Sequence, residues 1–443
     1  MSLQFFLIIA GFWILKPLKK TIFIEFYDKS GLDLPGFHLT ASKAELIAKN
    51  VNMVVAFFAM VLFVTVSKKL KKEKLLTALA LFSAAAVSLA GLFAQYPSDV
   101  SVFMFYSAGD LFNMLLVAGF FAFLNDSVSA LQAKKLYGTV IFGGVAGGVA
   151  GSTIFRSFVN TGSLNLWIFI TLLLVFLIIA LSVTAGKYLK KNSETFNRSS
   201  NLPAPENYEK LLNTKELQKI FKSKYILSIG AIVGLYELVS TIIDYQFTSA
   251  VASAFNGHHI GEYFGEVYLS VNIISLLVQL LLTGTLLKRA GVLKTVMALP
   301  VALIAGTLLF ALAPVLYIAT FLCISDNALN YSINQSAKET LYTVIKGQSR
   351  YTAKGFTDIF VQRSAKAAGV NLTLVLSMLL PVRWLAVLSG VLIFIWIQAA
   401  KYAGSYFEKN SGDSSGKKEE NQSSANIKTD FYKQSVPESD ASL

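Results

Sequence analysis

The sequence predicts an all-α membrane protein with twelve transmembrane helices in two six-helix bundles. Of its 443 residues, 54% are hydrophobic and 15% are charged, and the mean hydropathy is +0.57. Soluble domains are about 45 to 50% apolar and about 25% charged, so this composition excludes an ordinary soluble fold. Twelve apolar stretches have close to the roughly 20 residues that a helix needs to cross a bilayer.

The first apolar stretch is interpreted as a membrane span and not as a cleavable signal peptide. No small-residue cleavage site follows it, and lysines interrupt it in the middle. The expected spans, in chain order, cover residues 2–26, 45–66, 75–94, 101–124, 137–159, 165–185, 225–252, 262–285, 291–311, 314–335, 354–380 and 384–403.

The distribution of Lys and Arg predicts the orientation in the membrane. The chain has 39 Lys and Arg residues against 26 Asp and Glu, a net charge of +13. Outside the spans, the cations gather in the loops that follow even-numbered spans, such as "SKKLKKEK" at 67–74, as in the cytoplasmic loops of other membrane proteins. Both termini are therefore expected in the cytoplasm. Because topology accounts for the positive charge, we expect no nucleic-acid partner.

The longest internal loop is polar and basic, and it separates six spans from six. Two six-helix halves joined in this way are typical of major facilitator transporters, whose site lies between the halves near the middle of the bilayer. The last stretch is rich in Ser, Lys and Glu, which predicts disorder. The expected domains are an N-terminal six-helix bundle (1–185), a basic cytoplasmic linker (186–224), a C-terminal six-helix bundle (225–404) and a disordered cytoplasmic tail (405–443).

Three lysines interrupt the first span in the run "LKPLKK". Lys16, Lys19 and Lys20 have helical spacings of three and four, so they lie on one face of a helix. An ionisable group at the centre of a span costs roughly 2.5 to 3.5 kcal/mol on insertion scales. The alternative is that these lysines snorkel towards a helix end. The apolar stretch before Lys16 is too short to span alone, which favours a polar cavity instead.

Further charged and amide side chains lie within other spans, and the eleventh contributes two cations. An intramembrane charge is most easily retained beside an opposite charge, so for each pair structural locking and substrate contact remain equal alternatives. These residues are Asp110 and Asn113 in the fourth span, Glu237 and Asp244 in the seventh, Asp326, Asn327, Asn330 and Asn334 in the tenth, Lys338 just after it, and Asp358, Arg363 and Lys366 in the eleventh.

The glycine-rich run "GGVAGGVAGS" at 143–152 is interpreted as a helix-packing stripe, because its glycines repeat every four residues in an apolar helix. No GxxxxGK[ST] run occurs in the sequence, so a phosphate-binding P-loop is not encoded. Cys323 is the single cysteine, and His258 and His259 are adjacent in a loop, so we expect no metal site. No nucleophile or paired carboxylates stand out, and we predict neither an enzyme nor a cofactor.

The stretch "YSINQSAKETLYTVIKGQSRYTAKGFTDIFVQRSAKAAG" resembles the ATP/ADP antiporter family of plastids and bacteria. Three further stretches agree in order: "ILKPLKKT" resembles the family's first helix, "YSAGDLFNMLLVAGFFAFLNDSVSALQAKKLYG" its fourth helix and the following loop, and "STIIDYQFTSAV" its seventh. The departures are Lys20 where the family usually has Asp, Asp110 and Asp244 where it carries Glu, and Thr248 where it has Lys. These departures leave the substrate more open than the family.

The resemblance implies a secondary transporter in a bacterial inner membrane that exchanges nucleotides and works as a monomer. The alternatives are transport of another anion or a phosphorylated metabolite, coupled to protons through Asp110, Asp244 or Asp326, and a non-transporting scaffold or receptor. Under the resemblance, the residues expected to bind the anionic substrate are Lys16, Lys19, Lys20, Asp110, Asn113, Asp244, Asn330, Asn334, Lys338, Asp358, Arg363 and Lys366. We expect Lys19 and Lys366 to face one central cavity from opposite halves.

Overall fold

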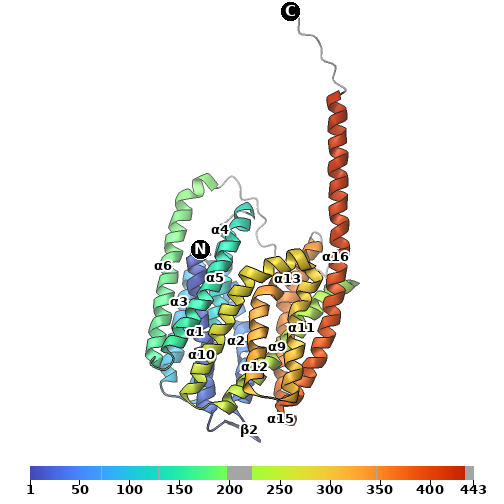
Figure 1. Ribbon diagram of the computed structural model, residues 1–443. Coiled ribbons are helices and arrows are strands. Elements are labelled where there is room, and N and C mark those ends of the chain that lie inside the picture. Colours follow the sequence, from blue (N-terminus) through green and yellow to red (C-terminus); the bar gives the residue numbers. More distant parts are fainter. Residues whose placement is uncertain (71, 128–129, 197–221, 346–347, 435–443) are drawn as a thin grey trace, which may run out of the picture.

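The computed structural model describes residues 1–70, 72–127, 130–196, 222–345 and 348–434. The N-terminal half matches the first six expected spans (Figure 1). Its helices are α1 (Ser2–Tyr27), α2 (Ala41–Lys69), α3 (Lys72–Ala94), α4 (Asp99–Ser127), α5 (Ala130–Phe158) and α6 (Leu164–Phe196).

A short antiparallel hairpin, β1 (Leu32–Leu34) and β2 (Phe37–Leu39), connects α1 to α2 and was not expected from the sequence. Its tight turn uses Gly36 at a φ of 84°, a conformation that glycine adopts without steric cost. The hairpin lies at the end of the bundle opposite the N-terminus (Figure 1). We call this the hairpin end, and the opposite end, where residues 67–74 join α2 to α3, the basic-loop end.

The C-terminal half supplies the remaining six spans, and several of its helices contain wider π-helical turns. Its elements are α9 (Lys224–Ala254), α10 (His258–Leu277), η1 (Val278–Thr283), η2 (Leu286–Ala290), α11 (Gly291–Leu312), α12 (Leu316–Leu329), η3 (Asn330–Asn334), α13 (Gln335–Leu341), η4 (Tyr342–Val344), α14 (Gln348–Gly355), η5 (Phe356–Val361), α15 (Gln362–Leu379) and α16 (Val382–Gln434).

The predicted fold class is confirmed: the protein has an all-α membrane fold with two six-helix halves. Among the described residues, nine helices are long and apolar enough to cross a membrane by themselves. The other three expected spans are the lysine-bearing α1 and the two that are interrupted by η3 and η5. Such π-turns are often found at functional sites, and these two contain Asn330, Asn334 and Asp358.

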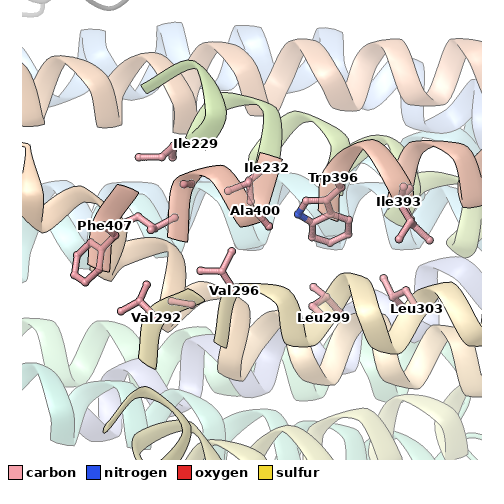
Figure 2. Close-up of a cluster of buried hydrophobic side chains, with 14 of the residues drawn as sticks. Ile229, Ile232, Val292, Val296, Leu299, Leu303, Ile393, Trp396, Ala400 and Phe407 are labelled. Atoms are coloured by element: carbon pink, nitrogen blue, oxygen red, sulfur yellow. The ribbon is translucent and has the colours of Figure 1, made fainter. Parts of the chain in front are cut away.

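Each half has its own apolar core. In the C-terminal half, Ile229 and Ile232 of α9 and Val296 and Leu299 of α11 belong to one cluster with Trp396 of α16 (Figure 2). The N-terminal half has an equivalent cluster of α1, α3, α4, α5 and α6 side chains. A third cluster contains side chains from both halves and lies towards the hairpin end. The two bodies are therefore separately packed and are joined by apolar contacts at one end.

The glycine-rich stripe of α5 packs closely against α1, as its spacing predicted. A Cβ atom added at Gly147 would lie 2.3 Å from the Phe6 carbonyl oxygen, and one at Gly151 would lie 2.3 Å from that of Ala10. Real Cβ atoms do not approach backbone so closely, so only glycine permits this helix separation. A Cβ atom added at Gly148 would lie 2.4 Å from Oδ1 of Asn272 in α10. A helix of the C-terminal half therefore also packs against the stripe.

The expectation of a disordered tail from residue 405 differs from the structure, in which α16 continues as one helix to Gln434 (Figure 1). Its polar composition indicates that this segment cannot form a core, but a polar segment that includes Lys and Glu can extend a helix that is already formed, because nucleation is the costly step. Residues 435–443, and residues 197–221 of the expected linker, lie outside the described residues.

Candidate functional site

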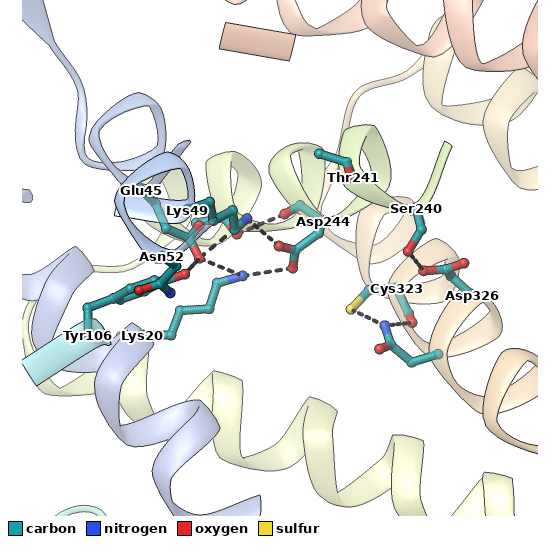
Figure 3. A network of polar contacts seen from close by, with 12 residues as sticks. Lys20, Glu45, Lys49, Asn52, Tyr106, Ser240, Thr241, Asp244, Cys323 and Asp326 are labelled. Atoms are coloured by element: carbon teal, nitrogen blue, oxygen red, sulfur yellow. Dashed lines mark hydrogen bonds and ion pairs between the residues drawn. The ribbon is translucent and has the colours of Figure 1, made fainter. Parts of the chain in front are cut away.

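A partly buried group of charged side chains joins the two halves, with Lys20 and Glu45 buried and Asp244 32% exposed (Figure 3). Lys20 of α1 lies with its Nζ 2.8 Å from Asp244 Oδ1 of α9 and 3.5 Å from Glu45 Oε1 of α2. Lys49 of α2 lies 2.5 Å from Asp244 Oδ2 and 3.5 Å from Glu45 Oε1. The side chain of Lys20 is only 4% exposed. Two lysines and two carboxylates therefore balance their charges across the interface of the halves.

A second ion pair lies within the N-terminal half, one helical step from the first. Lys19 of α1 pairs with Asp110 of α4, which also accepts a hydrogen bond from Asn52 of α2. The Lys19 ammonium also lies 4.1 Å from the centre of the Tyr106 ring. The lysine is 7% exposed, whereas the Asp110 side chain is 44% exposed. The accessible carboxylate therefore covers a buried cation, so an approaching anion would meet Asp110 first.

Lys16 is held by aromatic rings instead of a carboxylate. Its Nζ lies 4.5 Å from the Trp13 ring, 4.9 Å from Tyr268, 5.8 Å from Phe12 and 6.0 Å from Tyr331. Trp13 and Phe12 belong to α1, whereas Tyr268 and Tyr331 belong to the C-terminal half. Cation–π contacts of this kind stabilise an ammonium by roughly 0.5 to 2 kcal/mol. Within the described ranges, Lys16 has no carboxylate at ion-pair distance, and Asp244 and Asp326 act on it only at longer range.

The cations of α15 approach this region from the other half. Lys366 is exposed and lies within electrostatic range of Lys16 and of Tyr331. Arg363 is also exposed, with its Nη2 3.9 Å from Met114 Sδ of α4. In the part of the chain that the structure describes, Lys366 has no carboxylate partner. Two cations from opposite halves, each without an ion-pair partner in the described structure, therefore lie within electrostatic range of each other.

The remaining predicted residues gather in a separate group within the C-terminal half. Lys338 lies 3.4 Å from Asp358 Oδ1, and Asn334 donates a hydrogen bond of 2.9 Å to Asn330. A small pocket lies beside them, about 40 Å³ in volume, which is room for about one water molecule. Its lining includes Asn330, Asn334, Lys338, Tyr236, Glu237 and Gln362.

The predicted residues thus form two groups instead of one. The common cavity for Lys19 and Lys366 stays a prediction, because Lys19 is buried beneath Asp110 while Lys366 is exposed. Asn113 lies one helical turn from Asp110, and its Oδ1 atom is buried without a hydrogen-bond partner in the described structure.

Sequence reasoning missed Glu45 and Lys49. They lie in the first turns of α2, inside the expected span 45–66, but were not named among the candidate residues. Their spacing of four on one helix face is a signal for an ion pair, but it does not show that Asp244 completes the group.

Other polar contacts between the halves were also missed. Arg156 of α5 pairs with Glu266 of α10 at 2.7 Å, and Asn160 donates a hydrogen bond to Glu262. The amides of Asn50 and Asn371 bond each other, at 3.3 and 3.1 Å. All three contacts join elements that are more than a hundred residues apart in the sequence, so no local pattern indicates them.

The fold and the charged interface define a multi-pass membrane protein of the major facilitator type. The structure is similar to that of the nucleoside transporter NupG, with a TM-score of 0.59 and 15% identity over 91% of this chain and 100% of that one. A bacterial homologue of the iron transporter ferroportin in an inward-facing state has a TM-score of 0.51 and 13% identity over 92% and 98%. At these identities the likeness shows the fold alone.

Two relatives identified by sequence similarity are ADP,ATP carrier proteins, which confirms the resemblance seen in the motifs. The ADP,ATP carrier protein 1 of Chlamydia pneumoniae is 23% identical over 339 residues, and that of Chlamydia trachomatis is 22% identical over 340. The matches cover 67% of this chain and 65% and 63% of those proteins, so the chain spans slightly less than two thirds of their length. No protein-family model matches the chain.

Proposed function

We propose that the protein is a secondary transporter that exchanges nucleotides, ATP against ADP, by alternating access of its two halves. The observation that carries this proposal is that Lys16 and Lys366, from opposite halves, lie within electrostatic range of each other without ion-pair partners among the described residues. Two like charges in a weakly polar region repel each other. An anion that binds both relieves that repulsion and draws the halves together.

Nucleotides suit this arrangement because they carry a concentrated negative charge next to an aromatic ring. An ATP molecule has about four negative charges, which flexible lysines neutralise as point charges. Tyr331 is 46% exposed beside Lys16, so it offers a face on which a base can stack. Both Chlamydia relatives are named for carrying ADP and ATP.

The paired lysines supply a second step. Lys19, Lys20 and Lys49 are each neutralised by an acid in the structure. A phosphate group that approaches Lys19 competes with Asp110 for its charge, so substrate entry becomes an exchange of ion partners. A carrier that changes state only after this exchange moves one nucleotide for another, because the unoccupied form is held by its own ion pairs.

Exchange is tested with protein reconstituted into liposomes. Labelled ATP should enter vesicles preloaded with ADP and should not accumulate in empty vesicles. Lys366→Gln should slow this uptake, whereas Lys288→Gln, which changes an exposed lysine of η2, should leave it unchanged. Uptake that is equal in empty and preloaded vesicles would contradict obligate exchange, and the absence of uptake of any nucleotide would reject the nucleotide assignment.

A second candidate substrate is a smaller anion, such as a phosphorylated metabolite. Thr248 stands where the related antiporters have a lysine, and it is fully buried with its hydroxyl bonded to the Asp244 carbonyl at 2.8 Å. One cation fewer reduces the negative charge that the site neutralises. Competition of ATP uptake by a series of mono-, di- and triphosphates distinguishes the candidates, since a site for smaller anions should prefer monophosphates.

The proposed setting is a bacterial inner membrane, with a monomeric protein and both termini in the cytoplasm. The basic loops between α2 and α3 and around η2 support this orientation by the positive-inside rule. Labelling of a cysteine placed in residues 67–74 from the cytoplasmic side only is the expected result. Labelling from the opposite side would reverse the topology.

A further inference from the structure

Asp326 of α12 is a buried carboxyl group that the exchange mechanism does not use. The residue is 2% exposed, and its Oδ2 accepts a hydrogen bond of 2.6 Å from Ser240 of α9. Its Oδ1 is buried and has no hydrogen-bond partner in the described structure. The adjacent Asn327 does not help, because its amide donates back to the Cys323 carbonyl at 2.9 Å (Figure 3).

The groups that face Asp326 oppose its ionisation. From α9, Tyr236, Glu237 and Asp244 lie within electrostatic range, and the last two are carboxylates. The facing cation is Lys16 of α1, which is held in its aromatic cage and makes no ion pair with Asp326.

The other packed elements contribute no second cation. Cys323 and Tyr331 are the other titratable groups on the Asp326 side of α12 and η3. On α11 the described sequence has one charged residue, Lys294, which is exposed in the first turn of the helix. On α10, Tyr268 faces this region and lies 4.9 Å from Lys16 Nζ.

An ionised carboxylate in this position is unfavourable. Burial of a charge without an opposite charge and a full set of hydrogen bonds is so costly that the group takes up a proton instead. Asp110 and Asp244 differ from Asp326 in this respect, because lysines pair with both. Among these three acids of the spans, Asp326 is therefore the one that the structure leaves to bind a proton.

We propose that Asp326 is a proton-binding site, and that its proton promotes anion binding at Lys16. When the carboxyl is neutral, the positive charge of Lys16 is left for the anion. When the carboxyl is ionised, its negative charge competes with the anion for the same lysine. The anion part of this inference rests on the proposed function, whereas the proton site rests on the burial of Asp326 alone.

The proton balance follows from this competition. The proton is taken from water on the side where the anion binds, forms the O–H bond of the Asp326 carboxyl, and returns to water where the anion leaves. When one anion is exchanged for another, one proton enters with the incoming anion and one leaves with the outgoing anion, so no net proton movement results. Net uptake of an anion, in contrast, moves one proton with it. Exchange therefore remains possible without a proton gradient.

The coupling is measured as the pH dependence of ATP binding to the full-length protein in detergent. Raising the pH from about 5 to about 9, an interval that brackets ordinary and buried carboxyl groups, should weaken ATP binding by about 5- to 150-fold, the usual range of coupling between two sites. Asp326→Asn keeps a neutral side chain, so its binding should stay tight at both pH values. Asp33→Asn, which removes an exposed carboxyl in the hairpin, should keep the wild-type pH dependence.

A second readout needs no nucleotide. Infrared spectroscopy of the ligand-free protein should show the carbonyl band of a protonated carboxylic acid, which is lost in Asp326→Asn. If that variant does not fold, Ser240→Ala is used instead. Ser240 donates to the ionised form, so its loss should move the disappearance of the band to higher pH.

The outcomes separate the two proposals. A band that is absent throughout the pH range, or a pH dependence of binding that persists in Asp326→Asn, would overturn the inference. A band that titrates in the absence of any ATP binding would support the proton site and reject the nucleotide function. A band lost in Asp326→Asn together with pH-independent binding is the expected result.

Discussion

The two ends of the helical bundle differ in how their charges are paired. Towards the hairpin end, ion pairs cross between the halves: Lys20 and Lys49 with Asp244, and Arg156 with Glu266. A shared apolar cluster with Phe23, Phe247 and Phe264 lies there as well. Near the basic-loop end, the described pairs Lys338–Asp358 and Lys354–Glu339 each remain within the C-terminal half.

This difference separates the contacts that stabilise each six-helix half from the contacts that stabilise one particular arrangement of the two halves. Contacts within a half, such as the glycine stripe of α5 on α1, hold each six-helix body together whatever its partner does. Contacts between halves stabilise only the arrangement in which they form, so they must break when the halves move. Under the proposed function, the crossing charges would keep the hairpin end closed, and the substrate would approach from the basic-loop end.

The largest expected effect comes from breaking the central crossing pair. Asp244→Asn leaves two lysines with Glu45 alone, and breaking a buried ion pair costs about 3 to 5 kcal/mol. The closed hairpin end should therefore open. Thr248 is fully buried one helical turn after Asp244. In a Cys323→Ala background, a cysteine at position 248 should react with a maleimide at least about a hundredfold faster when Asp244→Asn is present than when it is absent.

The matched control for this experiment is Glu339→Gln, which breaks a pair that stays within one half. It should leave the labelling rate unchanged. Equal labelling in Asp244→Asn and the parent protein, with the fold intact, would show that the crossing charges do not hold the hairpin end closed.

The next effect concerns the cations without partners. Lys366→Gln should weaken ATP binding by about 1.5 to 3 kcal/mol, roughly 10- to 150-fold in Kd, which is the range for hydrogen bonds to charged groups. Lys19→Gln should weaken ATP binding by a similar amount, because it removes a cation that pairs with Asp110 in the structure and would pair with the substrate when it is bound. Isothermal calorimetry measures both, with Lys288→Gln as the control. Unchanged binding in both variants would exclude these lysines from the site.

A change within one half should affect folding alone. Gly147→Leu forces a side chain against the Phe6 backbone, and overpacking of this kind typically costs about 1 to 3 kcal/mol. The yield of folded protein in detergent should fall, while the protein that does fold should bind ATP with the parent affinity. Normal folding with selectively lost binding would instead make the stripe part of the ligand site.

The smallest effect is expected at the rim of the closed end. The Arg156 and Glu266 side chains are 35% and 54% exposed, and exposed pairs contribute about 0.2 to 1 kcal/mol. Arg156→Gln should increase labelling at the Thr248 position by no more than about fivefold. Near 1 M salt, where charges are screened beyond about 3 Å, parent and variant should be alike. A larger increase would mean that the rim pair and the central group act together.

Some features of the protein follow from local sequence alone. A span needs only enough consecutive apolar residues, so each of the twelve expected spans coincides with a helical segment, although α5, α6 and α16 extend well beyond the predicted bounds. The glycine stripe was recognised from its spacing of four. The lysines of α1 were identified as unusual because the cost of a charge in a bilayer depends on its own position and not on its neighbours.

Which acid neutralises which lysine was decided only by the tertiary structure. Lys20 meets Asp244 across 224 residues of sequence, Glu45 and Lys49 join them from α2, and Lys16 finds rings instead of a carboxylate. Asp326 looks equivalent to Asp110 and Asp244 in the sequence but is buried without an ion-pair partner in the described structure. Pairing depends on distances of a few ångströms between helices, and those distances are fixed by how the two halves pack, which no local pattern encodes.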